Sequence, residues 1–143
     1  MGIANLYVDS DDLHVIVWDG TVSGADWKQN IGDQTGDDPA WPRGRRRLID
    51  LTTLDPSELS ANDIETVIAF GRERIHQVAG RRQAIVALTA WDLAQEFARR
   101  SSELGATTIV FDRLDAACRW LSVDVAAARS IVAKLRTELR AQG

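Results

Sequence analysis

Residues 83–89, with the sequence QAIVALT, form a continuous apolar run without polar alternation. A strand of this kind is buried on both faces, as in parallel sheets that helices cover on two sides. Other strand-like runs precede and follow it, and most of them are separated by segments with the helical spacing of apolar residues. The run therefore predicts an α/β fold.

Five strands are expected along the chain, at residues 5–9, 13–18, 45–51, 83–89 and 107–111. Helices are expected at 23–31, at about 58–79, between Thr89 and Gly105 with Thr89 as the cap, and at 114–121. The order is β-β-α-β-α-β-α-β-α, followed by a C-terminal helical extension. Alternating strands and helices require right-handed crossovers, so we expect a mixed, mostly parallel five-stranded sheet covered by helices.

The length of 143 residues suits a single domain, which we expect at residues 1–123 and which a C-terminal helix at 124–143 follows. Apolar residues recur in this last helix with alternating spacings of three and four. They are Val125, Ala128, Val132, Leu135 and Leu139. Such a stripe packs on the chain's own domain or lies at a dimer interface, so a monomer or a homodimer is expected.

The formal net charge of −4 and the pI near 5.1 predict no general attraction for nucleic acid or for an anionic membrane. The polar start MGIANLYVDSDD resembles neither a secretory signal nor a membrane helix. The single cysteine, Cys118, excludes an internal disulfide. We therefore expect a reduced, cytoplasmic setting.

In open α/β sheets, ligands bind beyond the carboxyl ends of the strands. The polar residues expected at this rim are Asp50 in strand three, Thr52, Thr53 and Asp55 after it, Thr89 and Asp92 after strand four, and Asp112 after strand five. The rim is acidic and lacks both GxGxxG and GxxxxGK[ST], so we expect no nucleotide and no cofactor there. It is a candidate partner-binding surface instead.

Six arginines are expected at the opposite edge of the sheet, where strands three and four begin. They are Arg43, Arg45, Arg46, Arg47, Arg81 and Arg82. We expect a solvated edge, with a docking patch for an acidic partner as the alternative.

No catalytic or metal-binding group of residues is expected. His14 lies near Asp11 and Asp12, but these aspartates are turn formers and no ligand spacing accompanies them. His76 is expected on a surface, without a nucleophile at a fixed spacing. Trp41, between two prolines, is the candidate for an exposed contact, with packing over its own hairpin as the alternative.

The segments TVSGADW, GRRRLIDLTTL, RRQAIVAL and VFDRLDAACRWL occur in this order along the chain. Together they resemble the bacterial STAS domains, and more closely the small stand-alone proteins of that fold, over roughly residues 5–121. STAS domains act largely as protein-binding modules, and the best understood are anti-sigma-factor antagonists. These are switched by phosphorylation of a serine or threonine at the start of the helix after strand three. The resemblance thus implies a protein partner, such as a kinase or an anti-sigma-type regulator.

Asp50-Leu51 match the aspartate-leucine pair that STAS domains of this type carry in strand three. Asp55-Pro56-Ser57-Glu58 stands where those domains have Asp-Ser-Ser-Gly, but the gap is shorter and the serine-glycine pattern is replaced. By this resemblance, Ser57 and Ser60 are the candidate phospho-acceptors.

Ser60 also has a structural interpretation, because Ser60 followed by Asp63 matches a capping box. Such a cap contributes about 1 kcal/mol to helix stability. A phosphate at the same helix start would interact favourably with the helix dipole and change the surface charge by about −2. We expect Ser60 to act as the cap and Ser57 to be the better phospho-acceptor.

We therefore expect a non-enzymatic, STAS-like interaction or regulatory module. The alternative is a small-molecule or lipid carrier of CRAL-TRIO type, which requires an internal cavity of about 300 Å³. An enzyme ranks last, because Asp55, Asp92 and Asp112 supply carboxylates without an orienting histidine or a nucleophile.

Overall fold

The computed structural model of the chain describes the backbone of residues 2–35 and 45–142, and the side chains of these residues except 32–35. The strands are β1 (Gly2–Val8), β2 (Leu13–Thr21), β3 (Arg46–Asp55), β4 (Arg82–Ala87) and β5 (Thr107–Phe111). The α-helices are α1 (Gly24–Thr35), α2 (Ala61–Glu73), α3 (Ile75–Val78), α4 (Trp91–Ser102), α5 (Leu114–Leu121) and α6 (Val125–Gln142). Short 3₁₀ helices lie at Asp9–Asp11 and Pro56–Glu58.

The five strands form one sheet in the order β1-β2-β3-β4-β5, which is also their order along the chain. The pair β1/β2 is antiparallel, and the pairs β2/β3, β3/β4 and β4/β5 are parallel. This arrangement confirms the predicted mixed, mostly parallel five-stranded sheet. Since the strand order never reverses, the sheet has no topological switch point of the kind that opens a ligand crevice in doubly wound folds.

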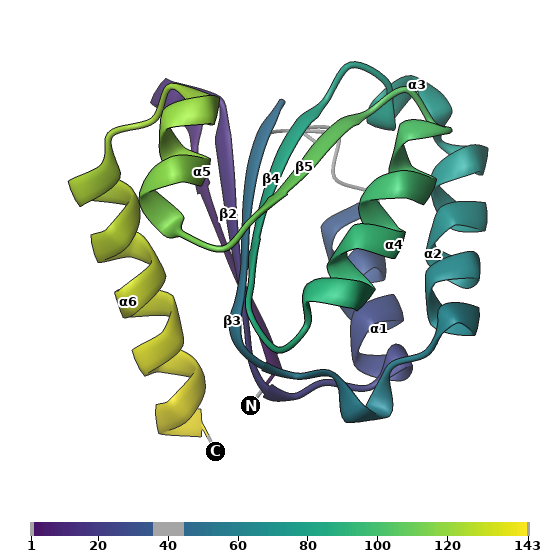
Figure 1. Cartoon of the computed structure of the whole chain (residues 1–143), viewed down its shortest axis with the longest axis horizontal. Helices are drawn as coiled ribbons and strands as arrows, with labels where there is room; N and C mark the ends of the chain where they lie inside the picture. The colour runs from purple at the N-terminus through teal and green to yellow at the C-terminus, as the bar shows by residue number, and fades with distance from the viewer. Residues whose placement is uncertain (1, 36–44, 143) are drawn as a thin grey trace.

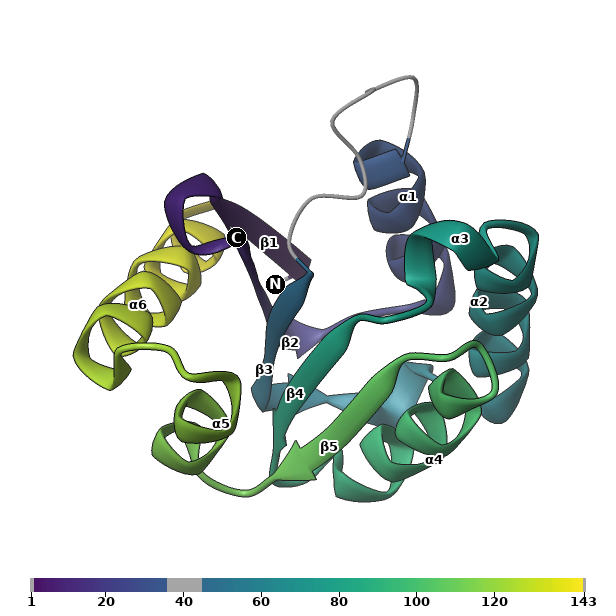
Figure 2. The same cartoon turned by 90° about the horizontal axis from the view of Figure 1, so that it is seen from above.

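The helices lie in two layers, one on each face of the sheet (Figure 1). Helices α1, α2 and α4 cover one face, and α5 and α6 cover the other, as the view from above also shows (Figure 2). Helices α1, α2 and α4 each connect one parallel strand to the next. Because these crossovers have the same hand and the strands follow one another in one direction, the three helices lie on the same face.

Each face of the sheet carries its own apolar core, because the central strands alternate their side chains between the two layers. Ile16, Trp18, Ile49, Leu51 and Ile85 face α1, α2 and α4. Val15, Val17, Leu48, Ala84 and Val86 face α5 and α6. The continuous apolar character of β4 thus reflects burial on both sides, as predicted.

The helix expected at about 58–79 is shorter and broken. It begins at Ala61, ends at Glu73, and is followed by the single turn α3. Arg74 leaves the helical conformation, with φ −122° and ψ 39°, and its guanidinium donates 3.3 Å to the Phe70 carbonyl oxygen of the last turn. The buried face of α2 therefore ends at the break, and Ile75 of α3 is 40% exposed.

Two local predictions were wrong. Thr89 does not cap α4, because Ala90 is the residue before the first turn and no side chain caps it; Thr89 is exposed. The helix expected at 23–31 extends further, since residues 32–35 also belong to α1. Trp41 and Arg43 lie outside the described residues.

Helix α6 packs on β1 and β2, with Ala128, Val132, Leu135 and Leu139 buried in the second core. The apolar stripe predicted from the spacing of three and four therefore faces the chain's own sheet. Across the described ranges, no helix is both long and apolar enough to span a membrane.

Candidate functional site

The carboxyl ends of β2 and β3 carry two buried carboxylates. Asp50, at 3% exposure, accepts hydrogen bonds from the Thr52 amide at 2.9 Å and the Thr52 hydroxyl at 2.7 Å. Arg136 of α6 donates from Nη2 to the same Asp50 oxygen at 2.8 Å. Asp50 therefore anchors α6 to the sheet. Asp50 was expected at the partner-binding rim, but its side chain is buried and paired with Arg136, so it is not exposed to a partner.

Asp19 is held in the same way by the next turn of α6. Arg140 donates from Nε and Nη2 to the two oxygens of Asp19, each at 3.2 Å, and Thr53 donates its hydroxyl at 2.6 Å. Burial of Asp19 raises the pKa of its carboxyl, but these hydrogen bonds and the Arg140 charge outweigh burial and lower it. The two buried carboxylates at this end are thus neutralised by arginines, which makes the rim less acidic than the sequence suggests.

Sequence reasoning missed Arg136 and Arg140. Each directly follows a buried residue of the apolar stripe, Leu135 and Leu139, and the two arginines stand one helical turn apart. A residue next to the buried stripe of a helix lies close to the surface on which the helix packs. This position could therefore have predicted that both arginines contact the sheet.

The other rim residues lie at the surface. Thr52 is half-buried, and the exposed ones are Thr53, Asp55, Thr89, Asp92 and Asp112. Leu88, which follows β4 directly, is 55% exposed. Because Leu51 and Ala87 are the last paired residues of β3 and β4, Thr53 and Leu88 both lie just beyond the paired part of these neighbouring strands. We call the exposed set around them the carboxyl-end surface: Thr53, Asp55, Ser57, Leu88, Thr89 and Asp92.

Ser60 forms the predicted capping box. Its hydroxyl accepts from the Asp63 amide at 3.4 Å, and its own amide donates to the Asp63 carboxylate at 3.0 Å. Ser57 has a different environment, in the exposed 3₁₀ helix Pro56–Glu58. Its amide donates to Asp55 Oδ1 at 3.0 Å, and hydrogen bonds from its amide and hydroxyl lower the pKa of the Asp55 carboxyl.

Among the described arginines at the amino ends of β3 and β4 only Arg45 is exposed, so most of this group is not the solvated edge that was expected. Arg46 donates to the carbonyl oxygens of Leu121 and Ser122 at 2.8 and 3.1 Å. Arg82 donates to the Trp120 carbonyl oxygen, and its guanidinium lies over the Trp120 ring at 4.6 Å. Both guanidinium groups therefore occupy the carboxyl end of α5, where unpaired carbonyls and the helix dipole favour a cation.

Successive side chains along a strand point to opposite faces of the sheet. The other described arginines of this group therefore face the layer of α1, α2 and α4; they are Arg45, Arg47 and Arg81. Arg45 is exposed and donates to the Ala79 carbonyl oxygen at 2.9 Å. Arg81 is buried, at 3% exposure. Burial, together with the charges of Arg47 and Arg45, lowers the pKa of Arg81 to about 9.

Arg47 is the centre of a polar row that crosses all five strands on this face. In register, the row runs through Tyr7, His14, Arg47, Gln83 and Thr108. Arg47 donates from Nη1 to Gln83 Oε1 at 2.9 Å, and Gln83 donates to Thr108 at 2.9 Å. Burial lowers the pKa of Arg47 to about 10, and its buried Nε has no hydrogen-bond partner.

His14 belongs to this row and is buried. Its Nε2 lies 2.9 Å from Oδ1 of Asn5, and its ring stacks on Tyr7 with 4.1 Å between centroids. Among the described residues, no group of three or more His, Cys, Asp or Glu side chains could hold a metal ion. His76 is exposed, as expected, and Cys118 is fully buried, with the pKa of its thiol raised by burial.

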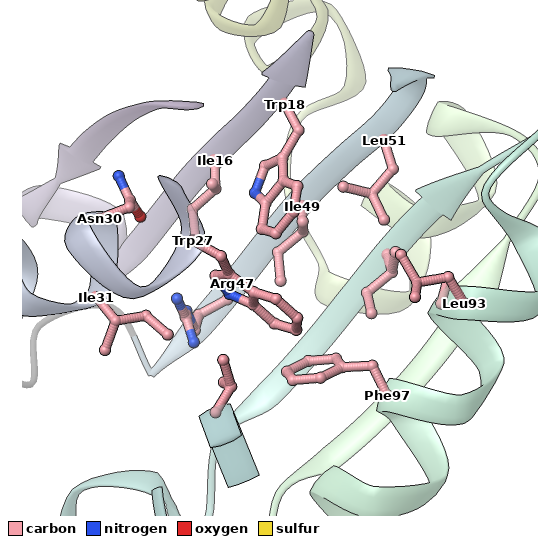
Figure 3. A pocket seen from close by; sticks show the side chains of 13 residues that line it. Ile16, Trp18, Trp27, Asn30, Ile31, Arg47, Ile49, Leu51, Leu93 and Phe97 are labelled. Carbon is pink, nitrogen blue, oxygen red and sulfur yellow. The ribbon is translucent and has the colours of Figure 1, made fainter. Parts of the chain in front are cut away.

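Two small cavities adjoin the Arg47 side chain between the sheet and the helices. The first, of about 90 Å³, is mainly apolar and includes Trp18, Trp27, Leu93 and Phe97 in its lining (Figure 3). The second, of about 70 Å³, continues toward Arg74 and Arg81. Both are lined by Ile31, Arg47, Val67 and Phe97. Each is smaller than the roughly 300 Å³ expected of a lipid-sized pocket.

No model of a known protein family matches the chain, and no curated protein is significantly similar to it. Its structure is similar to the crystal structure of an uncharacterized protein of the DUF3478 family from Shewanella loihica, which is described as having a SpoIIAA-like fold. The TM-score is 0.52 at 21% sequence identity, over 84% of this chain and 94% of that chain. The chain has a SpoIIAA-like fold.

This is the fold of the STAS domains of anti-sigma-factor antagonists, so the resemblance stated from the sequence is confirmed at the level of the fold. At 21% sequence identity, this similarity shows a shared fold and does not show a shared activity.

Proposed function

We propose that the chain is a non-enzymatic, cytoplasmic protein-binding module whose partner docks on the carboxyl-end surface. The exposure of Leu88 carries this proposal. A large apolar side chain that is 55% exposed among hydroxyl and carboxylate groups resembles the centre of a small interface, with an apolar contact inside a polar rim. Two other large apolar side chains, Ile75 and Ile109, are exposed elsewhere in the described ranges and provide controls.

Ser57 supplies a means of control for this surface. Its hydroxyl is exposed and does not cap α2, so its modification leaves the helix start intact. A phosphate there would place about two negative charges beside the Asp55 carboxylate, which the Ser57 amide contacts at 3.0 Å. Repulsion would then open the turn at Pro56–Glu58 and change the carboxyl-end surface. A kinase and a regulator that recognises the unmodified turn are the partners that this chemistry implies.

The alternative of a lipid carrier is less well supported than the module. Cavities of about 90 and 70 Å³ do not accommodate an acyl chain without a rearrangement of α1 or α4. The enzyme alternative has no support in the described residues, where Asp55, Asp92 and Asp112 are exposed and do not converge with a histidine or a nucleophile.

Cross-linking and capture from the native cells test the proposal. The chain and the variants Leu88→Asp and Ile75→Asp are compared, since Ile75 has a similar exposed fraction but lies in α3. We expect a specific partner that the parent chain and Ile75→Asp retain and Leu88→Asp loses. Equal capture by all three would exclude docking through Leu88. A peptide spanning residues 48–64 that is never phosphorylated in those cells would exclude Ser57 as the switch.

A further inference from the structure

The Arg47 side chain lies in an apolar environment with little to neutralise it. Its guanidinium extends among Trp27, Ile31 and Phe97 in the close view of the first cavity (Figure 3). Its one hydrogen bond among the described residues goes to the neutral Gln83 amide, and no described carboxylate lies within ion-pair distance of it. A guanidinium with a pKa of about 10 remains charged at neutral pH. Arg47 is half-buried and its Nε is fully buried, and a charge with so little solvent and no counter-charge is costly, so this position needs an explanation.

The charged side chains that line the two cavities are all basic among the described residues. Arg47 lines both cavities, and Arg74 and Arg81 line the second. None of the described residues that line either cavity is acidic. Gln83, the neighbour of Arg47 on β4, accepts its hydrogen bond and donates one to Thr108, so the guanidinium is held in place before any ligand arrives.

We propose that this site binds a small carboxylic acid with a compact apolar body, whose carboxylate pairs with Arg47 and whose body fills the adjoining cavity. The pairing uses the unpartnered Nε of Arg47, and a guanidinium edge matches a carboxylate in a two-point geometry. This role is separate from the protein-docking role of the carboxyl-end surface, because Arg47 lies near the amino end of β3 and Leu88 follows the carboxyl end of β4.

The size of the cavities limits how large the apolar part of the carboxylic acid can be. Each cavity alone is smaller than the dry cavity of about 150 Å³ that accommodates benzene. The two share Ile31, Arg47, Val67 and Phe97 in their linings, so a ring or a short branched chain is expected to span both. The aromatic side chains of Trp18, Trp27 and Phe97 meet edge to face, with centroids 5.2 and 5.5 Å apart, and present ring edges and faces to such a body. A long acyl chain would not fit.

Calorimetry on the full chain tests the proposal with three probes: phenylacetate, its neutral isostere phenylacetamide, and decanoate. We expect phenylacetate to bind at least about tenfold more tightly than phenylacetamide, because only the acid forms a charge-assisted pair. Decanoate should bind more weakly than phenylacetate. Equal binding of acid and amide, tighter binding of decanoate, or no binding of phenylacetate would each overturn the proposal.

Two variants locate the site. Arg47→Met keeps the side-chain length and removes the charge, so it should lower the affinity for phenylacetate to that for phenylacetamide. Arg129→Met makes the same charge change at an exposed position on α6 and should leave the affinity unchanged. If Arg47→Met does not fold, Ala94→Val decides, since Ala94 is buried in the first cavity and the larger side chain should exclude the phenyl ring. Unchanged affinity in Ala94→Val would place the ligand elsewhere and overturn the proposal.

Discussion

Arg136 and Asp50 join the last helix to the centre of the sheet, by a hydrogen bond of 2.8 Å between residues that are 86 positions apart in the chain. Asp50 is buried and receives two further hydrogen bonds from Thr52, so its charge is fully satisfied only when α6 is in place. The segment after residue 123, which the sequence resemblance did not include, thus completes the carboxyl end of β3.

Replacement of Arg136 by methionine should lower the free energy of unfolding by about 2 kcal/mol, because it leaves a buried carboxylate without its cation. Urea unfolding measures the change. The exposed Lys134 on the same helix is the control, and Lys134→Met should stay within about 0.5 kcal/mol of the parent. The double variant Asp50→Asn with Arg136→Met should cost less than the sum of the single changes. An additive result would mean that the pair does not interact.

Asp19 should make stability depend on acid pH. Its folded-state pKa lies below the ordinary value of 3.8, so the folded protein holds its protons less tightly than the unfolded chain. The Asp19 contribution is therefore present above the unfolded-state pKa and disappears as the pH falls through the folded-state value. Urea unfolding at pH 7 and at successively lower pH should show the stability gap between the parent and Asp19→Asn narrowing below about pH 4. A gap that does not change with pH would contradict this assignment.

The capping box at the start of α2 should be worth about 1 kcal/mol, so Ser60→Ala should lower the free energy of unfolding by that amount. Gly24→Ala should lower stability by a comparable amount. Gly24 is in α1, and a Cβ added there would clash with the Asp63 carboxylate of the α2 capping box. Ser57→Ala is the control, since its hydroxyl lies in an exposed turn, and should change stability by no more than about 0.5 kcal/mol. A larger loss in Ser57→Ala than in Ser60→Ala, measured by urea unfolding, would reverse the two roles.

The fold was largely predictable because its signals are local. The apolar run at 83–89 and the helical spacings between the strands identify a helix-covered parallel sheet without any knowledge of contacts. The capping box at Ser60 is local as well. Helix ends were less predictable: the break at Arg74 depends on how its side chain packs over Phe70.

The candidate sites were less predictable because they depend on contacts between distant segments. Arg46 and Arg47 are neighbours in the sequence, yet one caps α5 and the other enters a cavity beside α1 and α4. The alternation of side chains along a strand places the two arginines on opposite faces of the sheet. Their contacts, however, depend on which helices pack on each face. The pairing of Asp50 with Arg136 likewise has no local signal, so the rim seemed more acidic than it is.

Removal of α6 should have the largest effect of any change considered. A chain ending at Asp124 loses the buried stripe of Ala128, Val132, Leu135 and Leu139 and uncovers the apolar face of β1 and β2. An exposed apolar face of this size favours association, so light scattering should show oligomers or aggregates, and urea unfolding should show a large loss of cooperative stability. The full chain with Arg129→Met is the control, because it changes only the exposed side of the helix. A truncated chain that stays monomeric and unfolds cooperatively at the parent's urea midpoint would mean that α6 is dispensable for the second core.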